Sequence, residues 1–283
     1  MMSTSAGPVA YDSHGSGDPI VLLPSGGHDH HDYDELRGLL PGRFRSISID
    51  WPGHGRSPAG TMPATELALT QLVEELLDSL APAGAVLVGN SIGGNVATRL
   101  AIRRPDLVKG LVIIDGGGFE GSGRLSGRAF CALMSRPGFA RRIYPLFSRA
   151  YVRPRTAADR RARARAIATT RTTPGVTAVT EMWHSFSLPE HDLRAQAESI
   201  TAPTVLIWGR DDPVLPLRAG ETARELIPGS RLVVIESGHL PHTTNPAAVA
   251  AELIKLANAA FNTGSQTSTT RHGGPAAGQE QQQ

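Results

Sequence analysis

Short apolar runs, each bounded by glycine, proline or aspartate, alternate along the chain with longer segments that have the helical period. Runs of this length that are rich in Val, Ile and Leu are typical of strands buried on both faces of a parallel sheet. The predicted strands are residues 20–23, 46–50, 85–89, 111–115, 204–209 and 231–235. The predicted helices are residues 65–80, 92–104, 217–226 and 246–261. This alternation indicates an α/β fold with a mostly parallel, doubly wound sheet between two layers of helices.

The alternation stops between residues 116 and 199, where helical segments occur without a convincing buried strand. We predict that residues 116–199 form a helical insertion at the carboxyl edge of the sheet, and that residues 1–115 and 200–261 form the sheet domain. Residues 262–283 are rich in Gly, Ser, Thr and Gln and contain very few apolar residues. Such a segment buries too little surface to offset its ordering entropy, so we expect a disordered C-terminal tail.

Charge is distributed unevenly, although the formal net charge is only +2. Residues 120–171 contain thirteen arginines and two acidic residues. Such a cluster could steer anionic substrates by long-range attraction. The simpler interpretation is a set of solvated helix faces, such as the one that carries Arg160, Arg161, Arg163 and Arg165. No nucleic-acid-binding motif accompanies the charge, so we expect no nucleic-acid partner.

The single cysteine, Cys131, excludes an intramolecular disulfide and favours a reducing, cytoplasmic setting. Residues 1–15 lack the pattern of a secretory signal. No run approaches the ~18 to 20 apolar residues that a membrane span requires. We therefore expect a cytoplasmic protein without membrane association, and the sequence leaves its oligomeric state open.

The segment Gly89-Asn90-Ser91-Ile92-Gly93 carries the strongest chemical signal. It is a G-x-S-x-G motif that follows a predicted strand and begins a predicted helix, which is the context of a nucleophile elbow. A serine at this turn has a strained backbone and needs small residues two positions away. The motif therefore predicts Ser91 as a nucleophile, with the helix N-terminus available to stabilise negative charge. The alternative is an incidental Gly-Ser turn.

A serine nucleophile needs a base and an orienting acid, which follow it in the order Asp or Glu, then His. The strand at residues 204–209 runs into Asp211 and Asp212, and the strand at residues 231–235 is followed by His239 and His242. Both pairs follow strands, at the edge where an open α/β sheet carries its site.

Together these motifs resemble the α/β-hydrolase family, over about residues 9–261. In that family the acid commonly ends a Gly-x-x-Asp turn with a proline four residues further on, which selects Asp212; Asp211 is the alternative. The family's histidine usually belongs to a Gly-His pair with a proline seven residues later, which selects His239; His242 is the fallback.

Two upstream loops extend the resemblance. Residues 50–57 resemble the family's D-x-P-G-x-G-x-S turn, in which His54 is expected to be structural. The family's oxyanion loop often reads His-Gly-Gly, whereas here Pro24 replaces the histidine. The resemblance implies that the amides of Gly26 and Ile92 form the oxyanion hole, with Gly27 as the alternative to Gly26.

The same loop contains a cluster of possible metal ligands: His28, Asp29, His30, His31, Asp32 and Asp34. The spacing H-x-H-x-D resembles the start of the metallo-β-lactamase-like motif, but Tyr33 occupies its last position and suitable later ligands are missing. We therefore expect no metal and no cofactor. Some of these groups should be solvated, and His28 in particular should line the mouth of the pocket.

The resemblance implies a cap-bearing serine hydrolase that uses Ser91, His239 and Asp212 to cleave a small carboxylic ester or similar activated carbonyl through an acyl-enzyme. Its partner is then a small-molecule substrate. A serine at the elbow argues against haloalkane dehalogenases and related epoxide hydrolases, which use Asp there.

Three alternatives remain. The sequence GNSIGG resembles the corresponding motif of the carbon–carbon bond hydrolases of meta-cleavage type, although Leu240 stands where those enzymes often carry Trp. A cofactor-free lyase or perhydrolase could use the same triad. A ligand-binding signalling protein could retain it.

Overall fold

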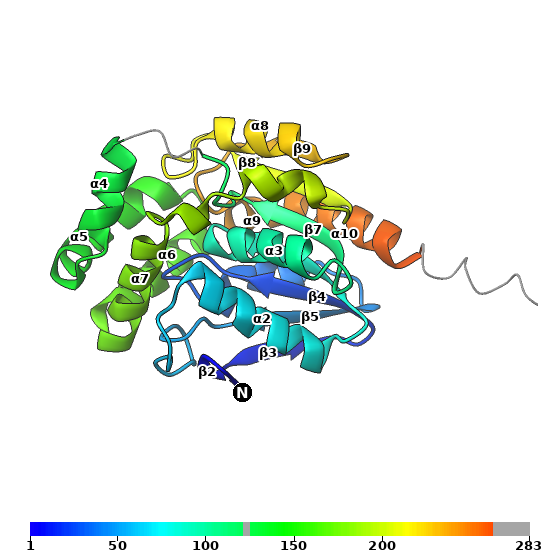
Figure 1. Ribbon diagram of the computed structural model, residues 1–283, viewed down its shortest axis with the longest axis horizontal. Coiled ribbons are helices and arrows are strands. Elements are labelled where there is room, and N and C mark those ends of the chain that lie inside the picture. Colours follow the sequence, from blue (N-terminus) through cyan, green and yellow to red (C-terminus); the bar gives the residue numbers. More distant parts are fainter. Residues whose placement is uncertain (121–124, 263–283) are drawn as a thin grey trace, which may run out of the picture.

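A seven-stranded sheet forms the centre of the computed structural model, which describes residues 1–120 and 125–262 (Figure 1). The strand order is β3-β5-β4-β6-β7-β8-β9, and β3 is antiparallel to β5 while the other neighbours are parallel. The strands of this sheet are β3 (Tyr11–His14), β4 (Asp18–Leu23), β5 (Phe44–Ile49), β6 (Ala85–Asn90), β7 (Val108–Ile114), β8 (Thr204–Gly209) and β9 (Arg231–Ile235). The mostly parallel α/β fold is confirmed.

All six predicted strands are present as β4 to β9. The sequence pattern missed β3 and the separate hairpin of β1 (Met2–Thr4) and β2 (Gly7–Val9). Strand β3 reads Tyr-Asp-Ser-His and lies at the edge of the sheet, where its side chains are partly or fully exposed. An edge strand of this kind needs no apolar run, so hydrophobic periodicity does not detect it.

Helices cover both faces of the sheet because the strand side chains alternate between the faces. Leu111 and Ile113 of β7 pack into the cluster that contains the apolar side chains of α2, α3 and α8. Val112 and Ile114 pack into the opposite cluster, with α1 and α10. These helices, and the short α9, are α1 (Asp34–Arg37), α2 (Glu66–Leu80), α3 (Ile92–Arg103), α8 (Leu217–Leu226), α9 (Pro241–Thr244) and α10 (Pro246–Asn262). No helix within the described ranges is long and apolar enough to cross a bilayer.

Four further helices lie between β7 and β8 in the chain and gather at one end of the sheet (Figure 1). They are α4 (Leu125–Met134), α5 (Pro137–Val152), α6 (Ala157–Arg171) and α7 (Thr173–Ser185), followed by the short 3-10 helices η2 (Pro189–His191) and η3 (Arg194–Ser199). A small core of their own holds them together, with Met134, Tyr144, Ala166 and Val179 buried at its centre. We refer to residues 125–185 as the helical roof. The predicted tail lies outside the described residues, except for Asn262, which ends α10.

Candidate active site

Ser91 lies at the sharp turn between β6 and α3, with φ 57° and ψ −117°. A backbone conformation of this kind costs on the order of 1–3 kcal/mol and persists only where the surroundings hold it. Here the amide of Ser91 donates to the carbonyl of Ile114 at 3.0 Å, and its carbonyl accepts from the amide of Asn95 at 3.1 Å. The strained turn is therefore secured by β7 on one side and by α3 on the other.

Glycines flank the turn because the chain passes too close for side chains. A Cβ on Gly89 would lie 2.1 Å from the carbonyl oxygen of Gly93, and a Cβ on Gly93 would lie 2.3 Å from that of Leu23. Both separations are far below van der Waals contact. The spacing G-x-S-x-G is thus a steric requirement of this turn.

His239 and Asp212 are in direct contact beneath the helical roof. Nδ1 of His239 lies 2.6 Å from Oδ2 of Asp212, and both side chains are almost fully buried. The other carboxylate oxygen, Oδ1, accepts from the amides of Val214 at 2.8 Å and Leu215 at 3.2 Å. These bonds hold the carboxylate so that its second oxygen faces the imidazole.

The two alternative residues point elsewhere. Asp211 is 35% exposed and pairs with Nη2 of Arg155 at 2.7 Å. His242 is buried and stacks on Tyr33 at 4.6 Å between ring centroids. Burial lowers the pKa of His242 to about 4, so its imidazole is neutral near pH 7. Of the four candidates, the structure brings Asp212 and His239 together.

Ser91 and His239 line one pocket, together with Ser25 and Gly26 of the loop after β4. The helical roof closes this pocket with side chains that include Tyr144, Phe147, Tyr151, Met182 and Trp183, and Phe186, directly after the roof, also lines it. No hydrogen bond joins Ser91 Oγ to His239 in the described part of the chain, and such contacts often tighten only when substrate binds. The cavity of about 30 Å³ has room for a water molecule or two, so a larger ligand can enter only if roof side chains move.

Asn90 connects the elbow to the histidine loop. Its Nδ2 donates to the carbonyl of His239 and to that of Ile114, both at 3.0 Å. The residue before Ser91 therefore anchors the backbone of the residue that would serve it as base. Sequence reasoning did not identify this role, since the two segments are far apart in the chain.

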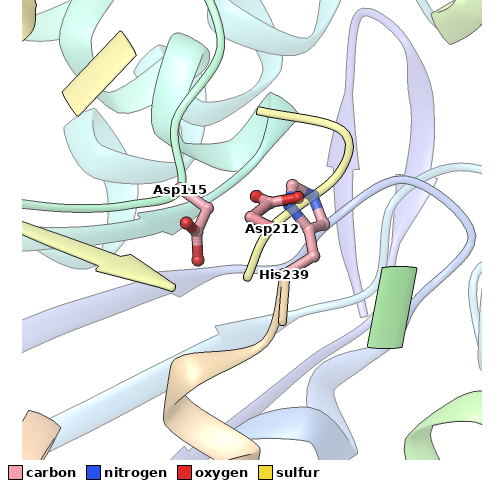
Figure 2. Close-up of side chains that lie close together, drawn as sticks. All are labelled: Asp115, Asp212 and His239. Carbon is pink, nitrogen blue, oxygen red and sulfur yellow. The ribbon is translucent and has the colours of Figure 1, made fainter. Parts of the chain in front are cut away.

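Asp115 is a second buried acid beside Asp212, and sequence reasoning missed it (Figure 2). Its Oδ1 accepts from the amide of Gly209 at 2.8 Å, and Oδ2 has no hydrogen-bond partner in the described structure. Burial, followed by the nearby Asp212 carboxylate, raises the pKa of Asp115 well above its usual range. The protonated form of Asp115 is therefore favoured. A signal was available, because Asp115 ends a predicted strand at the same sheet edge.

The carboxylates of Asp115 and Asp212 and the imidazole of His239 each offer an atom within 4.8 Å of the others (Figure 2). Two carboxylates and a histidine are a ligand set that some divalent metals use. Here, however, Asp212 Oδ2 and His239 Nδ1 already bond to each other at 2.6 Å. A metal would have to displace the proton that joins Asp212 to His239. A protonated Asp115 beside Asp212 is the simpler interpretation of this cluster.

His54 is buried against the loop after β4. Its Nε2 accepts from the amide of Gly27 at 2.9 Å, so Nδ1 carries the proton and donates to the carbonyl of Pro52 at 3.0 Å. Burial lowers the pKa of His54 to about 4, which keeps Nε2 an acceptor at neutral pH. The amide of Gly27 is thus already used. In the described structure the amides of Gly26 and Ile92 donate to no protein group.

Some members of the histidine–aspartate loop were expected to be solvated, and two of the six, His31 and Asp34, are about half exposed. His28, Asp29, His30 and Asp32 are buried. His28 is fully buried behind Tyr151 instead of lying at the pocket mouth, with Nε2 2.7 Å from the tyrosine hydroxyl. The pattern failed because the helical roof covers this loop.

Arg165 provides that cover and is not part of a solvated face. Its Nη2 lies 2.5 Å from Oδ1 of Asp32, and its Nε lies 3.0 Å from Oδ1 of Asp29. Asp32 also contacts Nδ1 of His28. His31 and Asp34 are about half exposed, as expected. The loop charges are therefore neutralised by one another and by the roof.

Comparisons with known proteins agree with this fold. Residues 20–252 match the profile of the alpha/beta hydrolase family. The chain is 28% identical over 255 residues to the pimeloyl-[acyl-carrier protein] methyl ester esterase of Nitrosomonas europaea, an alignment that covers 84% of this chain and 95% of that protein.

Solved structures have the same architecture. A hydrolase from Pseudomonas aeruginosa superimposes with a TM-score of 0.77 at 28% identity, over 90% of this chain and 96% of that one. A thermophilic esterase from Thermogutta terrifontis also gives a TM-score of 0.77, over 89% of this chain and 93% of that one. Its identity of 22% supports the likeness of fold alone.

Proposed function

The chain belongs to the α/β-hydrolase family, and on that premise we propose that it is a serine hydrolase that cleaves a small carboxylic ester or similar activated carbonyl. Ser91 is the nucleophile, His239 the general base and Asp212 the orienting acid. The observation that carries the proposal is the 2.6 Å contact between His239 Nδ1 and Asp212 Oδ2 in a pocket that Ser91 also lines.

In the first step Ser91 Oγ attacks the substrate carbonyl while His239 Nε2 accepts its proton. The alcohol leaves with that proton, and the acyl group stays on Ser91. Water then attacks the ester carbon, His239 again accepts the proton, and the acid is released from the regenerated serine. Asp212 keeps the proton of His239 on Nδ1, so that Nε2 remains free to act as the base.

Negative charge on the carbonyl oxygen is stabilised by the amides of Ile92 and Gly26. Both amides lack a protein acceptor in the described structure, whereas the amide of Gly27 already bonds to His54. One oxyanion donor typically contributes about 2.7–4 kcal/mol to the transition state. The alternative donor Gly27 is therefore disfavoured.

Residues 116–199 act in this proposal as a cap on a hydrolase core formed by residues 1–115 and 200–261. The cap side chains that face the pocket are mostly apolar, among them Phe147, Met182 and Trp183. Apolar walls fit a substrate with a hydrocarbon acyl or alcohol group. The small cavity means that turnover depends on cap movement.

The proposal is tested by treating the full-length protein with a fluorophosphonate and mapping the modified peptide by mass spectrometry. A chain-length panel of p-nitrophenyl esters is assayed in parallel, with Ser91→Ala as the matched variant. We expect stoichiometric labelling at Ser91, ester turnover by the unmodified enzyme, and neither property in Ser91→Ala.

Two results would overturn the proposal. Turnover by folded Ser91→Ala at the parent rate would remove Ser91 from its role. Saturable ligand binding without labelling or turnover would indicate a binding protein that retains the triad.

A further inference from the structure

Two tyrosine hydroxyls meet beside the loop after β4, in a roof that is otherwise mostly apolar. Tyr144 and Tyr151 lie on one face of α5, and their hydroxyl oxygens are 3.3 Å apart. Both side chains are almost fully buried, and both line the pocket that contains Ser91. Buried hydroxyls normally have partners, so the position of each proton decides what they can offer a substrate.

The proton of Tyr151 has an acceptor within the protein in either protonation state of His28. An ionised carboxylate can only accept, and Asp32 faces Nδ1 of His28. Burial alone would raise the pKa of Asp32, but the charge and hydrogen bond of His28 and the charge of Arg165 hold it at about 2. Nδ1 of His28 therefore carries a proton. If Nε2 is unprotonated, it accepts from the Tyr151 hydroxyl at 2.7 Å; if Nε2 is protonated, it donates to that oxygen, and the proton of Tyr151 is directed to the Tyr144 oxygen at 3.3 Å.

The proton of Tyr144 is also used within the protein. Its hydroxyl donates to the carbonyl of Gly26 at 3.2 Å, and the nearby Tyr151 oxygen is its one other partner among the described residues. The hydroxyl packs so closely on the backbone that a Cβ on Gly27 would lie 2.1 Å from it. Burial raises the pKa of Tyr144 to about 12, so it remains a neutral phenol.

Each phenol oxygen has one proton and two lone pairs. Because both protons are bound by protein acceptors, lone pairs are what the pair can offer to a bound molecule. The two tyrosine oxygens can therefore bind a ligand group that donates a hydrogen bond, but not a group that only accepts one.

We infer that Tyr144 and Tyr151 are specificity-determining residues that accept a hydrogen bond from a hydroxyl or N–H on the acyl part of the substrate, close to the reacting carbonyl. The preferred substrates are then hydroxylated or N–H-bearing acyl esters instead of plain alkyl esters. The hydroxyls lie beside Gly26, and the amide of Gly26 is the proposed oxyanion donor. The group that they bind should therefore lie close to the reacting carbonyl. The inference rests on the proposed function.

The test compares three groups of p-nitrophenyl esters on one C4 acyl chain: butyrate, the 2- and 3-hydroxybutyrates, and the matching methoxybutyrates. The methoxy compounds keep the oxygen but cannot donate. We expect one hydroxybutyrate to exceed both butyrate and its methoxy analogue in kcat/KM by about tenfold, the usual size of one net hydrogen bond. Tyr151→Phe should bring this selectivity close to one.

Tyr144→Phe gives an independent test, because Tyr151→Phe also leaves Nε2 of His28 without its partner and could destabilise the fold. Tyr11→Phe is the matched control: it removes a phenol hydroxyl from β3, outside the pocket. This variant should keep the selectivity of the parent.

The outcomes separate the two proposals. Equal kcat/KM for the hydroxy and methoxy esters in the unmodified enzyme, or selectivity that survives in both folded tyrosine variants, overturns the inference and leaves the serine hydrolase intact. Absence of turnover for every ester, together with absence of fluorophosphonate labelling, overturns the proposed function, and the inference falls with it.

Discussion

The amide of Gly27 donates to Nε2 of the buried His54 at 2.9 Å, and this bond ties the loop that carries Gly26 to the turn after β5. Trp51 Nε1, which donates to the carbonyl of Pro24 at 2.8 Å, and the Tyr144 hydroxyl, which donates to that of Gly26 at 3.2 Å, also hold this loop. In the proposed mechanism His54 is therefore a positioning residue for the Gly26 amide and does not itself touch the substrate.

We expect His54→Ala to lower kcat about tenfold with little change in KM, because a displaced oxyanion amide weakens transition-state binding more than substrate binding. Steady-state kinetics with p-nitrophenyl butyrate measures both constants. His31→Ala, at a half-exposed site outside the pocket, is the control. An increase in KM alone would show that His54 shapes substrate binding instead.

Asp212→Asn should reduce kcat by about 10⁴, because an amide in place of the carboxylate allows the wrong histidine tautomer. Asp211→Asn removes only exposed ion pairs with Arg153 and Arg155, so its kcat should stay within a few-fold of the parent. The two variants differ by one position in the chain and serve as controls for each other. If the larger loss followed Asp211→Asn, the acid would have to be reassigned.

Asp115→Asn should be well tolerated, because burial favours the protonated form of Asp115 and Asn is among the residues that adopt its positive φ of 40° most readily. Asp115→Ala should destabilise the fold by about 2 kcal/mol, since it leaves the buried amide of Gly209 without its acceptor. Urea unfolding and kcat are measured for both. A hundredfold loss of kcat in Asp115→Asn would mean that the reaction needs an ionisable group there.

His191 links the two ends of the insertion to the sheet domain and should make stability depend on pH. Its Nδ1 lies 2.6 Å from Oε1 of Glu66, and its Nε2 lies 2.5 Å from Oε1 of Glu120. Burial opposes protonation, but the two carboxylates raise the pKa of His191 from 6.5 to about 10. This contribution is fully present below pH 6.5 and is lost as the pH rises toward 10.

The expected loss between pH 6.5 and 10 is on the order of 3 kcal/mol in the free energy of unfolding. Urea unfolding at several pH values measures it, and subtracting the curve of His191→Gln removes the titration of other groups. Parallel pH profiles for the two proteins would show that His191 does not carry this dependence.

Gly93→Ala should cost about 3 kcal/mol of stability or prevent folding, because the new methyl group would meet the carbonyl oxygen of Leu23 at 2.3 Å. Gly42→Ala is the matched control, since no other atom lies within 4 Å of the position of its Cβ. Thermal or urea unfolding compares the two. Similar stability in both would mean that the elbow can relax around a side chain.

The sequence by itself determined the elements that depend on local pattern. Strands β4 to β9 and helices α2, α3, α8 and α10 follow from apolar periodicity. The context of Ser91 follows from two glycines, a strand and a helix within a short segment. These features are local because backbone sterics and side-chain period act over a few residues. Edge strand β3 escaped the pattern because its four residues contain no apolar run and two of them are exposed.

Only the tertiary structure decided which distant side chains meet. The contacts of Asp115 with Asp212, His54 with Gly27 and Arg165 with Asp32 join segments that are remote in the chain. Each depends on strand order, on register and on how the helical roof sits over the sheet, and a chemical pattern along one segment encodes none of these. The same packing buried His28, which was expected at the pocket mouth, because a long-range contact excludes water from groups whose local sequence is polar.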